Sequence, residues 1–288
     1  MTLHDLVVAA GGRLGRAGIR ESEARLDAEA LARLVLGWDR ARFLTNRHDE
    51  VPAGFRERYD LVIARRERRE PAPYIAGRRE FWGLDFEVSG DVLIPRPETE
   101  FLVEEALACS REAPSANGSP LVIDAGTGSG CLAVVLAREL PRARVVATDI
   151  SPAALRVARR NAVRHDVAAR VRFVRTNFLA GIRAAADLIV SNPPYVPRGV
   201  APGLSPEVRD FEPHVALFGG VDGLEHHRTL LAQAAGTLAP EGRLLVEFGA
   251  GQEEELLAVV AARPEFRVLH VRNDLQGIPR TMVLARSA

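Results

Sequence analysis

The stretch that decides the fold reads Leu121-Val122-Ile123-Asp124-Ala125-Gly126-Thr127-Gly128-Ser129-Gly130. A short apolar run of strand character passes directly into a glycine-rich loop, and a helical run follows. Glycine lets a backbone turn sharply and approach a ligand closely. The free N–H groups at the start of the following helix attract negative charge. This strand, loop and helix therefore predict a ligand site at one edge of an α/β sheet.

The spacing of the glycines indicates which class of ligand the loop binds. A dinucleotide fingerprint that starts at Gly126 requires its third glycine at position 131, where this chain has Cys131. The Gly-x-Gly-x-Gly pattern is instead typical of methyltransferases that use S-adenosylmethionine. Asp149 ends the next predicted strand, at a position where a carboxylate accepts hydrogen bonds from both ribose hydroxyls in nucleoside-binding α/β folds. We therefore expect an S-adenosylmethionine site that includes Asp149.

A second loop carries the expected chemistry. Asn192-Pro193-Pro194-Tyr195 follows the strand-like run 187–191, and α/β folds bind ligands outside the carboxyl ends of their strands. The prolines fix the backbone and remove two N–H donors. The Asn192 side-chain oxygen and the Pro193 carbonyl could each accept one N–H of a planar NH₂ group and aim its lone pair at a methyl donor. Tyr195 could stack on the flat group, and the reaction needs no metal.

Periodicity divides the chain into three parts. Residues 1–75 show helical spacing throughout, which predicts a small helical domain. Residues 81–94 change towards period two, which predicts a hairpin linker (76–97) with its turn at Ser89-Gly90-Asp91. Strand-like runs at 121–124, 144–148, 171–175, 187–190, 243–247 and 266–271 alternate with helical runs at 130–140, 152–165, 222–238 and 252–262. Residues 98–288 are therefore predicted to form a doubly wound, mostly parallel α/β domain.

Composition excludes several classes of protein. Of the 288 residues 47% are hydrophobic and 26% charged, which excludes a disordered or collagen-like chain. The 38 basic and 38 acidic residues balance, so we expect neither stable nucleic-acid binding nor attraction to a membrane surface. No lysine is present, which excludes lysine Schiff-base chemistry. No apolar run approaches a membrane span and no signal peptide is evident, so a cytoplasmic protein is expected.

Nearly the whole chain resembles the protein-(glutamine-N5) methyltransferases that modify class I peptide chain release factors. The run Ile94-Pro95-Arg96-Pro97-Glu98-Thr99-Glu100 carries most of the specificity, because nucleic-acid amino methyltransferases have loops similar to Asn192–Tyr195. Other matching segments are Pro73–Gly77, Phe81–Gly83, Gly126–Gly130, Glu212-Pro213, Ala216–Gly220, Asp222–Leu224, Asp274-Leu275 and Arg280.

The resemblance implies a fold and a set of roles. It implies a helical N-terminal domain that docks the substrate, a β-hairpin linker and a class I methyltransferase domain with a seven-stranded sheet. The glycine loop (Gly126, Thr127, Gly128, Ser129 and Gly130) would hold the methionine part of S-adenosylmethionine, and Asp149 the ribose. Asn192, Pro193, Pro194 and Tyr195 would receive the glutamine. The family usually has an acid where Thr176 stands, so Thr176 or Asn177 would contact the adenine instead.

Three alternatives remain at this stage. The acceptor could be a ribosomal-protein glutamine, although the continuation after Pro95-Arg96 favours a release factor. It could be a nucleic-acid base amino group, for which the basic run 65–69 would supply backbone contacts. The chain could also be a binding module that has lost its chemistry, against which the intact Asn192–Tyr195 loop argues. A dehydrogenase is disfavoured by Cys131 at the third-glycine position.

Overall fold

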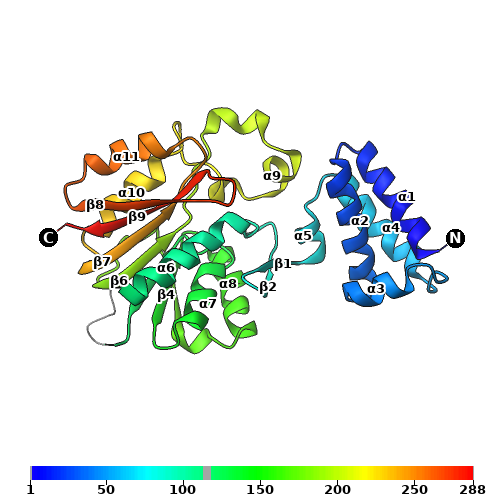
Figure 1. The fold of residues 1–288 in the computed structure, drawn as a ribbon, viewed down its shortest axis with the longest axis horizontal. Coiled ribbons are helices and arrows are strands. Elements are labelled where there is room, and N and C mark those ends of the chain that lie inside the picture. Colours follow the sequence, from blue (N-terminus) through cyan, green and yellow to red (C-terminus); the bar gives the residue numbers. More distant parts are fainter. Residues whose placement is uncertain (1, 113–117, 288) are drawn as a thin grey trace. The chain divides into compact units, whose positions relative to one another are not determined.

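The computed structural model describes residues 2–112 and 118–287. Contacts divide the chain into two compact units (Figure 1). One unit comprises the residues through Arg78 together with Ser205–Phe211, and the other comprises Arg79–Leu204 and the residues from Glu212 onward. The boundaries predicted from the sequence, at 75 and 97, did not anticipate that residues 205–211 group with the helical unit. The substrate-docking role of the helical domain stays a prediction.

The first unit is helical, as its periodicity predicted. Thr2 begins the first helix with a capping box, in which its hydroxyl accepts from the Asp5 N–H while the Asp5 carboxylate accepts from the Thr2 N–H. Gly37 ends the second helix in the left-handed conformation. Apolar side chains of these helices, including Leu14, Leu31 and Phe55, form one buried core. The helices are α1 (Leu3–Arg16), α2 (Glu21–Leu36), α3 (Arg40–Asn46), α4 (Phe55–Glu67), α5 (Ala72–Ala76) and α9 (Pro206–Phe211).

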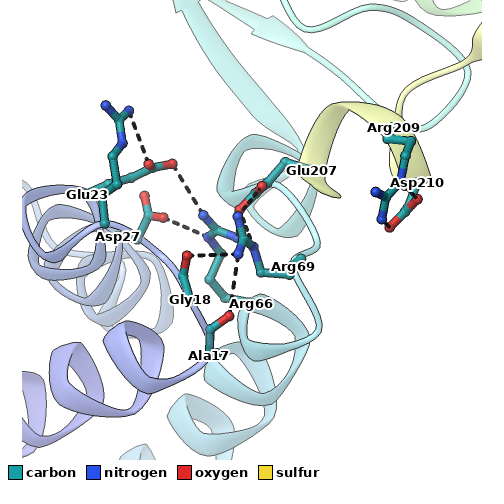
Figure 2. A network of polar contacts seen from close by, with 10 residues as sticks. Ala17, Gly18, Glu23, Asp27, Arg66, Arg69, Glu207, Arg209 and Asp210 are labelled. Atoms are coloured by element: carbon teal, nitrogen blue, oxygen red, sulfur yellow. Dashed lines mark hydrogen bonds and ion pairs between the residues drawn. The ribbon is translucent and has the colours of Figure 1, made fainter. Parts of the chain in front are cut away.

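An ion-pair network attaches α9 to the other helices of this unit (Figure 2). The Arg66 guanidinium, 1% exposed, donates to Asp27 at 2.7 Å, to Glu207 at 2.8 Å and to Glu23 at 3.3 Å. Arg69 donates to both carboxylate oxygens of Glu207, at 2.7 and 2.6 Å. Burial alone would raise the pKa of Glu207, but the hydrogen bonds from Arg69 and Arg66 lower it to about 2. Glu207 therefore holds its segment in the helical unit as a carboxylate.

The second unit contains a seven-stranded sheet in the order β5-β4-β3-β6-β7-β9-β8. The first five strands in this order run parallel, whereas β9 pairs antiparallel with both β7 and β8. The predicted fold class, a mostly parallel methyltransferase-type sheet, is confirmed. The strands are β3 (Leu121–Ala125), β4 (Arg144–Asp149), β5 (Val171–Arg175), β6 (Ala186–Ser191), β7 (Leu238–Glu247), β8 (Phe266–Asn273) and β9 (Pro279–Arg286).

Helices cover both faces of this sheet (Figure 1). Alternation along the strands explains the two layers, because Val122 belongs to one buried cluster and its neighbour Ile123 to the other. α6 (Glu100–Glu112), α7 (Cys131–Glu139) and α8 (Pro152–Arg164) lie on one face, and α10 (Glu225–Ala234) and α11 (Glu253–Ala261) on the other. Short 3₁₀ segments occupy Pro97–Thr99, Ala168–Arg170, Arg198–Gly203 and His214–Ala216. A strand buried on both faces reads as a continuous apolar run, which is how β3 was found.

Three details of the sequence-based fold were wrong. The hairpin consists of β1 (Arg78–Phe81) and β2 (Leu84–Glu87), so its turn lies at Trp82-Gly83 rather than at Ser89-Gly90-Asp91. Both turn residues have positive φ, 55° and 70°, which matches the turn geometry that two-residue hairpins require. Val92 and Ile94 are buried without belonging to a strand. β9 was missed, and the helix expected at 222–238 ends at Ala234 before β7 begins.

Within the described ranges, the structure contains no helix long and apolar enough to cross a membrane.

Candidate functional site

A cavity opens at the carboxyl ends of β3, β4 and β6 in the second unit. Predicted site residues from separate loops meet in its wall, and segments before α6 and around His214–Ala216 complete it. Gly130, Thr176, Pro193 and Tyr195 do not belong to this wall. The predicted residues that line the cavity are Gly126, Thr127, Gly128, Ser129, Asp149, Asn177, Asn192 and Pro194.

The glycine loop and Asp149 form one hydrogen-bonded part of the cavity wall. Asp149 accepts the Gly128 N–H through Oδ2 at 2.9 Å and the Ser151 N–H through Oδ1 at 2.8 Å. A carboxylate offers about four acceptor positions, so each oxygen keeps one for a hydroxyl pair. Gly128 has φ +53°, and a Cβ built there meets nothing within 4 Å. These residues fit S-adenosylmethionine, because the loop leaves open space beside acceptors suited to a ribose.

Two buried polar side chains, those of Asp124 and Asn161, form hydrogen bonds to the glycine loop. Asp124 Oδ2 accepts from the Thr127 hydroxyl at 2.5 Å and from the Ala133 N–H at 3.0 Å. Burial raises the pKa of Asp124 to about 7. Asn161, fully buried, donates to the Ser129 carbonyl at 2.8 Å and to the Glu87 carbonyl at 3.0 Å. The loop is thereby tied both to β3 and to the hairpin.

The adenine side of the predicted site differs from expectation at Thr176. The Thr176 hydroxyl donates to the Ala180 carbonyl at 2.7 Å, and Thr176 is not a cavity residue. Asn177 and Phe178 line the cavity instead. Phe178 has a positive φ of 49° and contacts His226, another lining residue, edge to face at 5.5 Å. Phe178 was not among the site residues predicted from the sequence, although an aromatic side chain directly after Asn177 was a visible candidate to stack on a base.

Asn192 and Pro194 of the Asn192–Tyr195 loop line the cavity, while Pro193 is buried and does not line it. Gly219 allows a close approach to this loop, because a Cβ there would stand 2.5 Å from the Pro194 carbonyl oxygen. The Tyr195 carbonyl accepts from Gln252 Nε2 at 3.0 Å. The Gln252 side chain therefore anchors the loop through the Tyr195 carbonyl, and the missing side chain of Gly219 leaves room for the Pro194 carbonyl.

Residues 91–99 form another side of the cavity. Arg96 donates to the buried Glu212 at 2.5 Å, and the Ile94 N–H donates to the same carboxylate at 3.4 Å. Burial raises the pKa of Glu212, although Arg96 opposes that effect. This ion pair fixes the segment whose members Arg96 and Thr99 line the cavity.

Glu247 is a functional candidate that sequence reasoning did not single out, whereas Thr99 belongs to the run Ile94–Glu100 that carried the resemblance but had no individual contact assigned to it. Asn192 Nδ2 donates to the Thr99 hydroxyl at 3.0 Å, and that hydroxyl donates to Glu247 Oε2 at 2.7 Å. The Tyr195 hydroxyl donates to Glu247 Oε1 at 3.3 Å. Burial raises the pKa of Glu247 to about 7. No local pattern joins these residues, which lie 93 and 148 positions apart in the two contacts.

Comparison with known families and proteins gives consistent matches. A family model described as "PrmC N-terminal domain" matches residues 5–77, and one described as "Methyltransferase small domain" matches residues 106–201. A relative named release factor glutamine methyltransferase from Cereibacter sphaeroides is 43% identical over 286 residues, covering 99% of both chains. A relative of the same name from Moorella thermoacetica is 41% identical over 287 residues, again covering 99% of both.

Among solved structures, a methyltransferase from Pyrococcus furiosus aligns with a TM-score of 0.52 at 20% identity. The alignment covers 72% of this chain and 91% of that one. At this identity the likeness concerns the fold alone.

Proposed function

The chain belongs to the release factor glutamine methyltransferase family, and from this premise we propose that it methylates the side-chain amide nitrogen (N5) of the glutamine in the Gly-Gly-Gln motif of class I release factors. S-adenosylmethionine would serve as the donor. The observation that carries the proposal is the meeting of Asn192 and the glycine loop in one cavity wall. The residues that we propose to bind the donor and the acceptor thereby face the same space.

The residues that would hold the donor are those of the glycine loop and Asp149. When bound, S-adenosylmethionine supplies an electrophilic methyl group on a sulfonium. The carboxylate of Asp149 is already oriented by the Gly128 and Ser151 N–H groups, so ribose hydroxyls meet a preorganised acceptor. Phe178 and Asn177 line the same cavity and offer a flat face and an amide to the base.

The acceptor amide needs activation, because its nitrogen lone pair is delocalised into the carbonyl group. Asn192 turns Nδ2 towards Thr99, which leaves Oδ1 as the end available to a substrate N–H. The Pro193 carbonyl, predicted from the sequence as the acceptor of the second N–H, belongs to a residue that does not line the cavity, so this role stays a prediction. Two acceptors on one NH₂ group orient its lone pair and stabilise the positive charge that develops on nitrogen during transfer.

Rigidity of the acceptor loop supports this role. Consecutive prolines restrict the backbone of the Asn192–Tyr195 loop. Gln252 donates a hydrogen bond to the Tyr195 carbonyl, and Gly219 leaves room for the Pro194 carbonyl. A loop that needs no rearrangement keeps its acceptors aimed when the substrate arrives. We further propose the release factor as protein partner and the cytoplasm, where translation terminates, as the place of action.

Mass spectrometry of a class I release factor incubated with this protein and S-adenosylmethionine tests the proposal. We expect one added methyl group on the peptide that contains Gly-Gly-Gln, located at the glutamine by fragmentation. A release factor with that glutamine changed to alanine is the matched control and should gain none. Efficient methylation of a ribosomal protein or of RNA, with the release factor unmodified, would overturn the proposal.

A further inference from the structure

We propose that Thr99 and Glu247 are positioning residues that fix which end of the Asn192 amide faces the acceptor. The inference rests on the proposed function, because it explains how the acceptor loop is kept in its productive state. It concerns a hydrogen-bonded relay of three side chains from three separate elements. Asn192 follows β6, Thr99 ends the 3₁₀ segment before α6, and Glu247 ends β7.

The relay is buried at its inner end. Thr99 is 3% exposed and Glu247 is 1% exposed. Glu247 Oε2 accepts from Thr99, and Oε1 accepts from the Tyr195 hydroxyl. Its backbone carbonyl accepts from the buried His227 Nε2 at 2.8 Å, so the end of β7 is itself held in place. Thr99 and Asn192 both line the cavity, and of the two Asn192 is the more exposed.

Proton counting gives the relay a direction. A carboxylate can only accept hydrogen bonds, and a hydroxyl has one proton to donate. When the Thr99 proton goes to Glu247, the Thr99 oxygen is left as an acceptor. It must then receive an N–H, so the nitrogen end of the Asn192 amide turns towards Thr99. Oδ1 is consequently left to face the cavity.

This direction matters because the two ends of an asparagine amide have nearly the same size. Rotated by half a turn, Asn192 would offer N–H donors to a substrate NH₂ group that also donates. Neither group could then accept from the other, and the acceptor nitrogen would lose a contact on which its orientation depends. Packing alone discriminates poorly between the two orientations of the amide. The charged Glu247 carboxylate, in contrast, selects one orientation through Thr99.

The ionisation of Glu247 sets when the relay operates. Burial raises the pKa of Glu247, and the neighbouring Glu98 raises it as well, while the hydrogen bonds from Thr99 and Tyr195 and the charge of Arg280 lower it. The net value is about 7. Above it, the carboxylate accepts from Thr99. Below it, protonated Glu247 can donate to Thr99, which frees the Thr99 proton for Asn192 Oδ1 and permits the reversed amide.

Nuclear magnetic resonance of the Asn192 side chain tests the relay without any acceptor substrate. The Nδ2 protons are assigned by their loss in Asn192→Ala. In the wild type at pH 8 we expect one of them to be shifted and protected from exchange, with a pH dependence that follows Glu247. Thr99→Val should abolish the shift and Thr99→Ser should retain it. Unchanged signals in Thr99→Val would overturn the inference.

Kinetics supply the functional readout. For Thr99→Val we expect kcat to fall roughly 10- to 100-fold, as for a misaligned reacting group, with the S-adenosylmethionine Kd unchanged and activity recovered in Thr99→Ser. Glu247→Gln should lower kcat and remove its rise with pH near neutrality, because a glutamine amide can also donate to Thr99. Thr237→Val is the matched control, since Thr237 is a buried threonine that donates to the Gln233 carbonyl away from the site.

The two proposals fail in different ways. An inactive wild type on release factors would overturn the proposed function, while the Asn192 resonances would still decide the relay. An active wild type with an equally active Thr99→Val would overturn the relay and leave the proposed function standing. Loss of activity in Thr99→Val without rescue by Thr99→Ser would also contradict the relay, since it would indicate a packing defect.

Discussion

Replacing Arg66 with methionine tests whether its buried ion pairs hold the helical unit together. Arg66 contacts three carboxylates, those of Asp27, Glu207 and Glu23. Methionine keeps a long apolar stem but removes the charge and its donors. We expect a large loss of stability, because the partner carboxylates would remain in their partly buried positions.

The size of the loss follows from what each carboxylate retains. Glu207 keeps two hydrogen bonds from Arg69, and the Glu23 side chain is 42% exposed and can be solvated. Asp27, 17% exposed, loses its Arg66 contact and becomes the main uncompensated charge. Breaking a buried pair costs about 3–5 kcal/mol, so we expect a destabilisation near the lower limit, about 3 kcal/mol.

The assay is urea unfolding followed by tryptophan fluorescence. The chain has two tryptophans, of which Trp38 packs against the helical core and Trp82 lies in the other unit. In a Trp82→Phe background, Trp38 therefore reports on the helical unit. The shift of the urea midpoint at constant slope gives the change in the free energy of unfolding. Arg68→Ala, an exposed residue two positions further along the chain, is the matched control, with an expected change within about 0.5 kcal/mol.

A double mutant identifies the source of the cost. If Asp27 is the uncompensated charge, Asp27→Asn added to Arg66→Met should restore part of the stability. Burial already raises the pKa of Asp27, so the penalty of Arg66→Met should also shrink at acidic pH as Asp27 takes up a proton. A loss below about 1 kcal/mol for Arg66→Met, in the range of an exposed ion pair, would refute the reasoning, as would simple additivity in the double mutant.

Three further outcomes are expected. Asp149→Asn should weaken S-adenosylmethionine binding about 10- to 100-fold by calorimetry, because a charged acceptor is lost and the new NH₂ group faces a backbone donor; unchanged affinity would contradict the ribose role. Thr281→Val should leave the free energy of unfolding unchanged or raise it by about 1 kcal/mol, because the Thr281 hydroxyl is fully buried and has no hydrogen-bond partner within the described part of the chain. A clearly lower melting temperature of the variant would contradict this. In the absence of donor, the free energy of unfolding should fall as the pH rises from about 4.5 to 7. Asp124 and Glu247 have pKa values raised to about 7, so the folded state binds more protons than the unfolded state in that pH range. A flat pH profile, or the same slope in Glu247→Gln, would contradict this prediction.

Local signals explain what the sequence predicted well. The β3 run, the glycine loop and α7 are contiguous, so their residue types alone specified the turn and the helix start. The buried parallel strands appeared as apolar runs for the same reason. Ser89-Gly90-Asp91 carries equally strong turn residues, yet Trp82-Gly83 forms the hairpin turn. Phe81 and Phe86 pack edge to face across that turn. This contact between side chains is not visible in the hydrophobic periodicity from which the turn was predicted.

Long-range contacts explain what the sequence did not reveal. Glu247 is connected to the Asn192 side chain through the Thr99 hydroxyl, and three distant elements must fold before the relay exists. Glu207 joins the helical unit through arginines 138 and 141 positions away. The family resemblance led us to expect that Thr176 or Asn177 contacts the adenine, but the Thr176 hydroxyl bonds to the Ala180 carbonyl in its own turn. Such local competition for a hydroxyl is decided by backbone geometry.

The most direct test of the central claim separates turnover from donor binding in Asn192→Ala. We propose that Asn192 binds the acceptor amide and that the glycine loop and Asp149 bind the donor. Loss of most turnover on a release factor, with a calorimetric Kd for S-adenosylmethionine close to that of the wild type, is the predicted result. Wild-type-like turnover in Asn192→Ala would contradict the account.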